Sequence, residues 1–222
     1  MGLNLFNPIT YLITSGETTA ATTPSTEDFA RLLNLVSAAI AARVNLIQLR
    51  EKNLNARVLY ELAARAAALT HGSPTRLLIN DRADIAQAAG ADGVHLTASS
   101  LEAAIVRSTF GADFLIGVST HSLSEARAAR DGGADFAVFG PVFETATKMV
   151  YGEPVGLGKL ADVARELSPF PIIALGGVTL TNVWDCVRAG ASGIAGISLF
   201  SQGDDLQRIV RLLQEAVRAA DE

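Results

Sequence analysis

The sequence predicts a single (βα)8 barrel of the TIM type, and three observations carry this prediction. Eight short apolar runs recur along the 222 residues, with helical patterns between them. Most of the runs are continuously apolar, which is typical of strands in a parallel sheet that is covered on both faces. No linker or change of composition divides the chain. We therefore expect one domain over residues 1–222, with functional groups at the carboxyl ends of the strands. A doubly wound open sheet is the structural alternative.

The strands and helices follow from these runs in chain order. The expected strands are ITYLIT (9–14), VNLIQLR (44–50), RLLIND (76–81), GVHL (93–96), FLIGVS (114–119), FAVFGPVF (136–143), PIIALGG (171–177) and GIAGISLF (193–200). Between the first three, apolar residues recur at the spacing of an amphipathic helix. These stripes comprise Phe29, Leu32, Leu33, Val36 and Ile40, and then Val58, Leu62, Ala66 and Leu69.

Capping residues predict where helices begin. A serine followed three residues later by Asp or Glu is a capping-box pattern, in which each side chain pairs with an amide that the helix leaves without a partner. The pattern occurs at Ser25–Asp28, Ser99–Glu102 and Ser122–Glu125. We therefore expect a helix to begin at each of these places.

Composition excludes several classes of function. The net charge of −5 argues against a general nucleic-acid or anionic-membrane surface. The longest apolar runs are far shorter than the ~20 residues that span a bilayer, and the amino-terminal segment lacks the basic region and cleavage site of a signal peptide. The single cysteine, Cys186, excludes an intramolecular disulfide and a multi-cysteine metal site, and we expect it to be a packing residue. The sequence thus predicts a soluble cytoplasmic protein without nucleic-acid or membrane partners.

Polar residues gather where the expected strands end. From the second strand to the eighth, they are Gln48, Arg50 and Lys52; Asn80 and Asp81; His95; Ser119 and His121; Thr145, Thr147 and Lys148; Gly176 and Gly177; and Ser198. Lysines and arginines beside hydroxyls and a Gly-Gly turn predict binding of phosphate oxygens, with room for two anionic groups. Taken singly, Arg50 and Lys52 fit equally well as rim charges paired with Glu51 or Asp81.

The three histidines have different expected roles. His121 precedes the expected N-cap Ser122, so it either closes the fifth loop by hydrogen bonding or acts as a general acid or base. His95 lies within a strand, where we expect a structural histidine. His71, beside Gly72, is expected at the surface.

Seven motifs resemble those of a known family. In chain order they are QLREK, LLINDRADIA, ADGVHL, IGVSTHS, GADFAVFGPVFETATK, PIIALGGV and GIAGIS, between Tyr11 and Phe200. Together they resemble the thiamine phosphate synthase family, which includes the TenI-type thiazole tautomerases. The resemblance implies a barrel enzyme of thiamine biosynthesis, usually a homo-oligomer. Its reaction joins hydroxymethylpyrimidine diphosphate to a thiazole phosphate and releases diphosphate.

The resemblance also implies roles for individual residues. The pyrimidine diphosphate would be held by Gln48, Arg50, Lys52, Asn80, Thr147 and Lys148. Ser119 would lie close to the pyrimidine, and Lys148 and Ser119 are the expected catalytic residues. The thiazole or its phosphate would contact Thr145, Gly177, Ile197 and Ser198, and Gly176 is a further expected substrate-binding residue. Asp81 matches a ligand for Mg²⁺, where a carboxylate and diphosphate oxygens share the ion.

The chain departs from the family pattern after the fourth strand. Synthases typically read G-V-H-L-G-Q-x-D there, and the final aspartate is a second ligand for magnesium, whereas this chain has Ser100. Met149 and Val150 form a second departure, because synthases usually continue with charged residues. Both changes favour a metal-independent tautomerase that aromatises carboxythiazole phosphate with His121 as its acid or base.

The residues that the chain retains favour the opposite choice. Asn80, Asp81 and Lys52 are often lost in the tautomerases, so their presence favours synthase chemistry. A phosphate-binding or regulatory protein of the same fold is a third possibility, since fold alone does not fix function.

Overall fold

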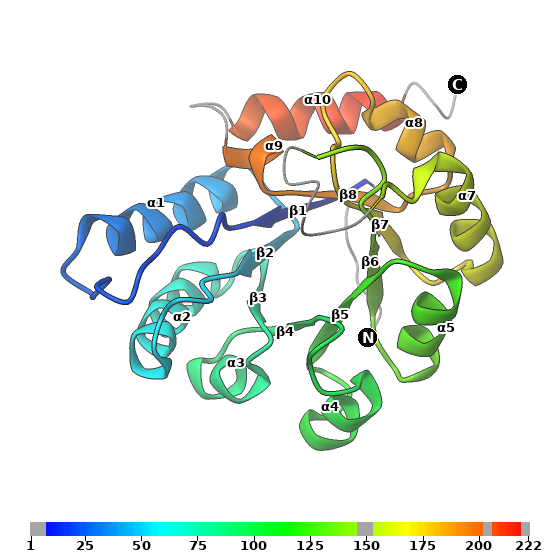
Figure 1. The fold of residues 1–222 in the computed structure, drawn as a ribbon. Coiled ribbons are helices and arrows are strands. Elements are labelled where there is room, and N and C mark those ends of the chain that lie inside the picture. Colours follow the sequence, from blue (N-terminus) through cyan, green and yellow to red (C-terminus); the bar gives the residue numbers. More distant parts are fainter. Residues whose placement is uncertain (1–7, 146–152, 202–205, 219–222) are drawn as a thin grey trace.

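Eight parallel strands close into a barrel in chain order, as Figure 1 shows. The structure is a computed structural model that describes residues 8–145, 153–201 and 206–218. The strands are β1 (Ile9–Ile13), β2 (Leu46–Leu49), β3 (Arg76–Asn80), β4 (Gly93–Leu96), β5 (Leu115–Thr120), β6 (Phe136–Phe139), β7 (Ile172–Ala174) and β8 (Gly193–Gly196). The β1–β8 pairing closes the sheet, so the barrel prediction is confirmed and the open doubly wound sheet is excluded.

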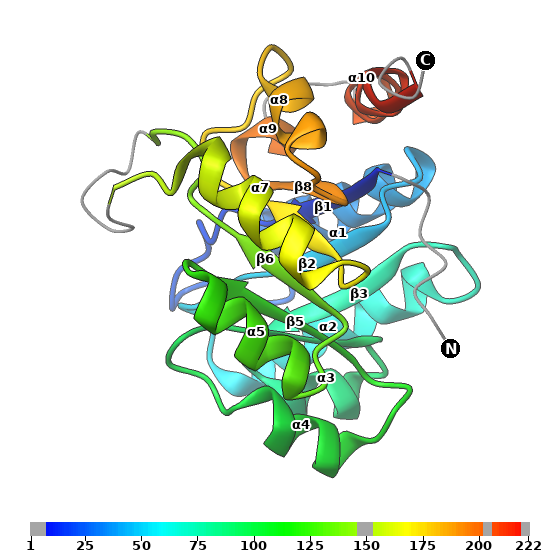
Figure 2. The same ribbon diagram turned by 90° about the vertical axis from the view of Figure 1, so that its right-hand side faces the viewer.

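The helices lie outside the barrel and follow one another around it (Figures 1 and 2). They are α1 (Glu27–Ala41), α2 (Ala56–Thr70), α3 (Ala83–Ala89), α4 (Ala103–Phe110), α5 (Leu123–Asp131), α7 (Gly156–Leu167), α8 (Val183–Arg188), α9 (Ser198–Ser201) and α10 (Leu206–Arg218). The expected stripe on α2 is wrong at one position. Leu69 is exposed, because the buried face of α2 runs through Ala66 and Thr70.

The prediction of helix starts is right once and wrong twice. Ser122 caps α5, where its hydroxyl accepts a hydrogen bond from the Glu125 amide. By contrast, α1 is preceded by Thr26 rather than Ser25, and α4 begins at Ala103, after Glu102, without a side-chain cap. The reason at α4 is local, because the Ser100 hydroxyl accepts from the Thr97 amide at 2.7 Å and closes a turn within the loop.

Alternate side chains of the strands fill the barrel, as the twofold period of a strand requires. The interior cluster consists of Ile9, Tyr11, Ile13, Leu46, Leu78, Phe136, Val138, Ile173 and Ala195, with Leu115, Leu175 and Ile197 packed against it. The intervening strand residues, such as Leu12, Ile47 and Leu77, pack beneath the helices. Side chains at interior positions of different strands therefore meet inside the barrel, whereas the residues next to them in the sequence point outward toward the helices.

Three of the expected strands end three or four residues early, at 139, 174 and 196 instead of 143, 177 and 200. β6, β7 and β8 stop at Phe139, Ala174 and Gly196; the apolar residues that follow β6 and β7 belong to loops over the carboxyl end of the barrel, and those that follow β8 enter α9. Two of these loops pair with each other, because the Val142 amide donates to the Leu175 carbonyl at 2.8 Å. Ser198, expected on the eighth strand, instead begins the short helix α9.

The amino ends of the strands are braced by a repeated contact. A polar residue immediately before each of β2, β4 and β6 accepts a hydrogen bond from a backbone amide of the preceding strand. The pairs are Asn45 with Thr10 at 2.9 Å, Asp92 with Leu77 at 2.8 Å, and Asp135 with Ile116 at 2.7 Å. Each pair ties two neighbouring strands together below the barrel interior.

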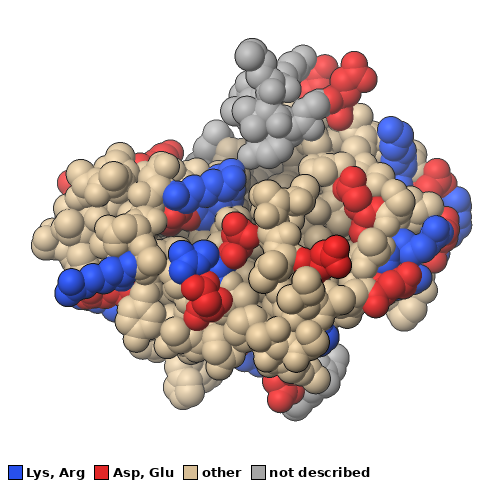
Figure 3. Space-filling view, turned by 60° about the horizontal axis from the view of Figure 1, so that its bottom comes forward, with Lys and Arg blue, Asp and Glu red and all other residues tan. Residues whose placement is uncertain are grey.

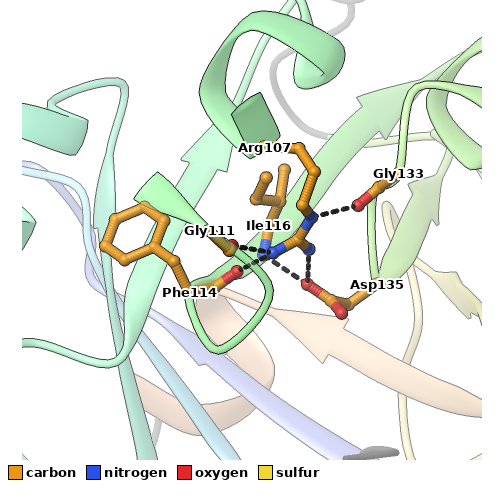
Figure 4. A network of polar contacts seen from close by, with 6 residues as sticks. All are labelled: Arg107, Gly111, Phe114, Ile116, Gly133 and Asp135. Atoms are coloured by element: carbon orange, nitrogen blue, oxygen red, sulfur yellow. Dashed lines mark hydrogen bonds and ion pairs between the residues drawn. The ribbon is translucent and has the colours of Figure 1, made fainter. Parts of the chain in front are cut away.

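Arg107 extends the third of these braces into a larger network (Figure 4). Its guanidinium donates to the Asp135 carboxylate at 2.8 Å and to backbone carbonyls of Gly111, Gly133 and Phe114 at 2.6, 3.0 and 2.7 Å. The network therefore joins α4, the end of α5 and the starts of β5 and β6 through one side chain.

Lys, Arg, Asp and Glu side chains of both signs are interspersed on the face shown in Figure 3. Within the described part of the chain, no helix combines the length and apolar character needed to cross a bilayer. Cys186 is buried, and burial raises the pKa of its thiol to about 12. The expectation of a packing residue is confirmed.

Candidate active site

One side chain from each of the strands β1 to β5 joins a single hydrogen-bonded chain inside the barrel. The Asn80 amide oxygen accepts from the Gln48 amide nitrogen at 2.9 Å, and the Gln48 amide oxygen accepts from the Tyr11 hydroxyl at 3.2 Å. The Tyr11 hydroxyl also lies 3.1 Å from Nδ1 of His95, whose Nε2 lies 2.8 Å from the Ser119 hydroxyl. Three predicted site residues, Gln48, Asn80 and Ser119, are thus linked through Tyr11 and His95.

The middle of this hydrogen-bonded chain is uncharged and buried. Tyr11, Gln48 and His95 are buried, whereas Asn80 and Ser119, at the two ends, are partly exposed. Burial lowers the pKa of His95 to about 3 and raises that of Tyr11 well above its usual value, because a low-dielectric interior disfavours either charged form. His95 is therefore a neutral, fully hydrogen-bonded histidine, as the sequence suggested, and the described residues contain no buried side-chain polar atom without a partner.

Packing holds the two rings of the chain in place. Phe136 lies edge-on to Tyr11 at a centroid distance of 5.6 Å and tilted to His95 at 6.4 Å. Gly117 provides the space for this arrangement, because a Cβ atom there would lie 2.4 Å from the Phe136 ring and 2.9 Å from Nδ1 of His95. The aromatic layer forms a floor beneath the mouth of the barrel.

The predicted cations Arg50 and Lys52 follow β2. Arg50 is half-buried, and its guanidinium lies beside Gly16 in the loop after β1, 3.3 Å from where a Cβ atom of that glycine would be. Lys52 is exposed. Between them, the buried Glu51 carboxylate accepts from the hydroxyls of Thr14 at 2.5 Å and Thr18 at 2.6 Å. Glu51 thereby fixes the loop after β1 against the segment that carries both cations.

A cavity of about 380 Å³ lies beside this loop, between α1 and residues of α9 and α10. Its walls include Thr18, Leu35, Glu51 and Phe200, and none of the predicted site residues lines it. We place the candidate site at the barrel mouth rather than in this cavity, because the polar residues at the strand ends converge at the mouth.

The predicted magnesium ligand Asp81 is exposed directly after β3. Its φ of 62° lies in the left-handed region, which Asp tolerates better than most residues, and its amide donates to the His95 carbonyl at 2.9 Å. Ser100, on the loop after the neighbouring strand β4, uses its hydroxyl within its own turn. Among the residues described, no group of three or more His, Cys, Asp or Glu side chains comes together.

This donor set suits magnesium delivered with a substrate. Mg²⁺ is usually held by one or two carboxylates together with substrate phosphates and water. Asp81 fits that arrangement, whereas a cage built from protein ligands alone is not present among the described residues.

His121 closes the fifth loop by hydrogen bonding, and one of its ring nitrogens could also act as a general base. Its backbone amide donates to the Glu125 carboxylate at 2.6 Å, and its Nδ1 contacts the Gly140 carbonyl oxygen. A carbonyl oxygen can only accept, so Nδ1 carries the proton and Nε2 keeps the basic lone pair. The side chain is exposed, and both roles expected for it fit this geometry.

Gly176 and Gly177 have a steric reason to be glycine. Both have positive φ, 94° and 66°, and a Cβ atom would lie 2.4 Å from Pro141 at the first and 2.5 Å from the Glu144 carbonyl oxygen at the second. The pair lets the loop after β7 pack against the loop that begins with Pro141. This close packing places Phe143 and Glu144, which precede Thr145, against the loop after β7.

The remaining predicted residues divide into three groups. Ile197 is partly buried and packs against the interior cluster, and Ser198 is exposed at the start of α9. Thr145 is partly exposed at the last described position of its loop. Thr147 and Lys148, together with Met149 and Val150, lie outside the described residues.

The sequence did not single out Tyr11 as part of the site. The available signal was its phase, since Ile9, Tyr11 and Ile13 alternate with residues that pack under the helices. A tyrosine inside a barrel needs a partner for its hydroxyl, and that requirement could have directed attention to Gln48 and His95.

Comparisons with known proteins identify the family of the chain. The family profile described as thiamine monophosphate synthase matches residues 19–200. A Methanospirillum hungatei protein named thiamine-phosphate synthase is 42% identical over 75% of this chain and 80% of its own length. A Chloroflexus aurantiacus protein of the same name is 38% identical over 85% of this chain and 86% of its own length.

A solved structure extends the likeness to nearly the whole barrel. Thiamine phosphate pyrophosphorylase from Pyrococcus furiosus superposes with a TM-score of 0.78 and 28% identity, and the match covers 96% of this chain and 97% of that one. 3-Hexulose-6-phosphate synthase, at 18% identity and a TM-score of 0.64, shares the fold alone. The profile and the relatives together show that the chain belongs to the thiamine monophosphate synthase family.

Proposed function

We propose that this chain is a thiamine-phosphate synthase, a transferase that condenses hydroxymethylpyrimidine diphosphate with thiazole phosphate. Relatives of that name at 36–42% identity over most of the chain support the assignment. The observation that carries it is the joining of Gln48, Asn80 and Ser119 by one hydrogen-bonded chain that leads to the barrel mouth. These residues are three of those that the family resemblance assigns to the pyrimidine substrate.

The proposed reaction breaks the bond between the pyrimidine methylene carbon and diphosphate. Diphosphate leaves with the electron pair, and the thiazole ring nitrogen then forms the new C–N bond to that carbon. The developing negative charge needs preorganised cations and donors. Arg50 and Lys52, with Lys148, would supply the cations, and the Asn80 amide would supply a donor. Thr147 would bind the diphosphate through its hydroxyl, whereas Thr145 would contact the thiazole or its phosphate.

The second substrate is assigned to the opposite side of the mouth. Gly176, Gly177, Ile197 and Ser198, which lie after β7 and β8, would contact the thiazole or its phosphate. Magnesium, when bound, would neutralise charge on the diphosphate oxygens, and Asp81 would be its protein ligand. A homo-oligomer and a cytoplasmic location stay predictions.

Product formation from both phosphorylated substrates tests this function. We expect thiamine phosphate and diphosphate, with activity that falls when a chelator is added. Asn80→Ala should lower kcat/KM for the pyrimidine substrate by about 10- to 100-fold, since one hydrogen bond to a charged group is lost. Ser73→Ala, on the loop before β3, is the matched control. Absence of product at saturating magnesium would remove the proposal.

Thiazole tautomerase activity is the second candidate, and two observations favour it. Ser100 stands where synthases have a carboxylate, and the proton on Nδ1 of His121 leaves Nε2 as a base. A tautomerase should isomerise carboxythiazole phosphate equally well with and without chelator. His121→Ala should abolish that isomerisation; if it keeps full activity, the tautomerase mechanism is wrong.

A binding protein of the same fold would behave differently from both enzymes. It would take up phosphorylated ligands without turnover in either assay. Running both assays on one preparation, with and without chelator, therefore separates the three possibilities.

A further inference from the structure

The hydrogen-bonded chain inside the barrel has a direction, which can be read from the Gln48 amide and which Tyr11 and His95 carry to Ser119. The amide nitrogen of Gln48 faces Asn80 and its oxygen faces Tyr11, so the single hydroxyl proton of Tyr11 points to Gln48. The Tyr11 oxygen must then accept from His95, which places the imidazole proton on Nδ1. Nε2 of the neutral ring can only accept, so the Ser119 hydroxyl donates to it.

The two ends of the chain consequently differ in what they offer to a ligand. The Ser119 hydroxyl donates its proton to His95, so only its oxygen lone pairs are available at the mouth. The Asn80 amide oxygen accepts from Gln48, so the hydrogens on its amide nitrogen are available at the mouth. One end of the site is thus an acceptor, and the other is a donor.

We propose that Tyr11 and His95 are positioning residues that fix this polarity and thereby set the orientation of the pyrimidine substrate. This inference rests on the proposed function. The exocyclic amino group of the pyrimidine donates to Ser119, and oxygens of its diphosphate accept from Asn80. Were the direction reversed, Ser119 would donate and would face an N–H group without an acceptor.

Burial explains why these two residues act through others. Tyr11 is fully buried and His95 nearly so, beneath Gln48, Asn80 and Ser119, so neither ring reaches the mouth. Tyr11 also links β1 to β4, which are not neighbours in the sheet. It thereby joins the Gln48–Asn80 part of the hydrogen-bonded chain to the His95–Ser119 part across the barrel interior. The aromatic contacts with Phe136 hold both rings without adding a competing polar group.

The histidine tautomer is the direct test, and it requires no turnover. The protein has three histidines, so the ¹⁵N-histidine spectrum can be assigned with the variants His71→Gln and His121→Gln. We expect His95 in the intact protein to show a protonated Nδ1 and an unprotonated Nε2. A proton on Nε2 would reverse the chain and overturn the proposal.

Ligand discrimination tests the consequence for the substrate. The probes are hydroxymethylpyrimidine phosphate and its analogue in which hydrogen replaces the amino group, with both dissociation constants measured by calorimetry. The unmodified protein should prefer the amino compound by about 10- to 100-fold, because the analogue leaves the Ser119 acceptor without a donor. Tyr11→Phe removes the group that fixes the tautomer, so the preference should fall toward unity.

Phe136→Leu is the matched control for a purely structural effect. It disturbs the packing of the same rings but retains every hydrogen-bonding group, so the unfolding midpoint should fall while the preference for the amino compound persists. An unchanged preference in Tyr11→Phe would refute the positioning role. If neither compound binds the unmodified protein, the assigned substrate and the proposed function are both wrong, whereas the tautomer measurement still decides the direction of the chain.

Discussion

At the amino ends of the strands, Arg107 and Asp135 form an ion pair that is mostly buried and bonded to surrounding backbone groups, whereas the chain through Tyr11 and His95 near the carboxyl ends carries no charge. Every side-chain group of the charged network is bonded to another group of the same network or to the backbone, so none is left for a ligand. The neutral chain ends on Asn80 and Ser119, which face the barrel mouth. One network is closed on itself, and the other leaves two polar groups for a ligand.

The difference indicates how one barrel separates stability from function. A buried ion pair is costly unless every hydrogen-bonding group around it is satisfied, and the Arg107 network meets that condition with several backbone partners. A neutral chain avoids this cost and can transmit hydrogen-bond direction from one end to the other. Loss of the first network should therefore affect folding, and loss of the second should affect recognition.

The largest expected effect comes from Asp135→Ala, which breaks the closed network. The change removes the partner of the Arg107 guanidinium and leaves the Ile116 amide without its acceptor. We expect the free energy of unfolding in urea to fall by about 3 kcal/mol, while kcat/KM of the folded fraction is unchanged. Glu166→Ala, in the exposed pair with Arg127, is the control and should cost at most ~0.5 kcal/mol. Equal losses in the two variants would contradict the distinction.

Gly117→Ala should instead damage both stability and recognition. The added Cβ would lie 2.4 Å from the Phe136 ring and 2.9 Å from Nδ1 of His95, so the rings must move. Overpacking of this kind costs about 1–3 kcal/mol, and displacement of His95 should also lower kcat/KM. Gly158→Ala is the control, because a Cβ atom there meets no atom within 4 Å. Full activity in Gly117→Ala would show that the ring positions do not matter for the site.

The sequence predicts the order of elements well because burial on both faces of a parallel strand leaves a strong local signal. It fails at Ser25 and Ser99, because their hydroxyls contact those of Thr23 and Thr97 and neither caps a helix. It also fails at the ends of β6 to β8, where the apolar residues continue into packed loops or, after β8, into α9. The link from Tyr11 to His95 depends on the phase of β1 and on the closure of the barrel. The phase can be read from the sequence of β1 itself, whereas the closure that brings Tyr11 to His95 is not contained in any single segment.

Acid should lower the stability of the protein, because the buried His95 must stay neutral in the folded state. Because its pKa is lowered from 6.5 to about 3 by burial, the unfolded state binds the extra proton between these values, and stability falls as the pH drops below about 6.5. Relative to His95→Gln, the native protein should lose about 2 kcal/mol of unfolding free energy between pH 7.5 and pH 5. His71→Gln, at an exposed position, should keep the native pH profile. Identical profiles for His95→Gln and the native protein would contradict the buried neutral ring.

The smallest effect is expected at the mouth itself, where Ser100→Asp should strengthen magnesium binding. One carboxylate oxygen can keep the bond from the Thr97 amide that the serine hydroxyl now accepts at 2.7 Å, and the other can face the ion beside Asp81. We expect the magnesium concentration for half-maximal activity to fall about tenfold, or ~1.4 kcal/mol. Ser99→Asp places the same charge on the exposed side of the loop and should change it little. If both variants shift the requirement equally, net charge rather than coordination at position 100 is responsible.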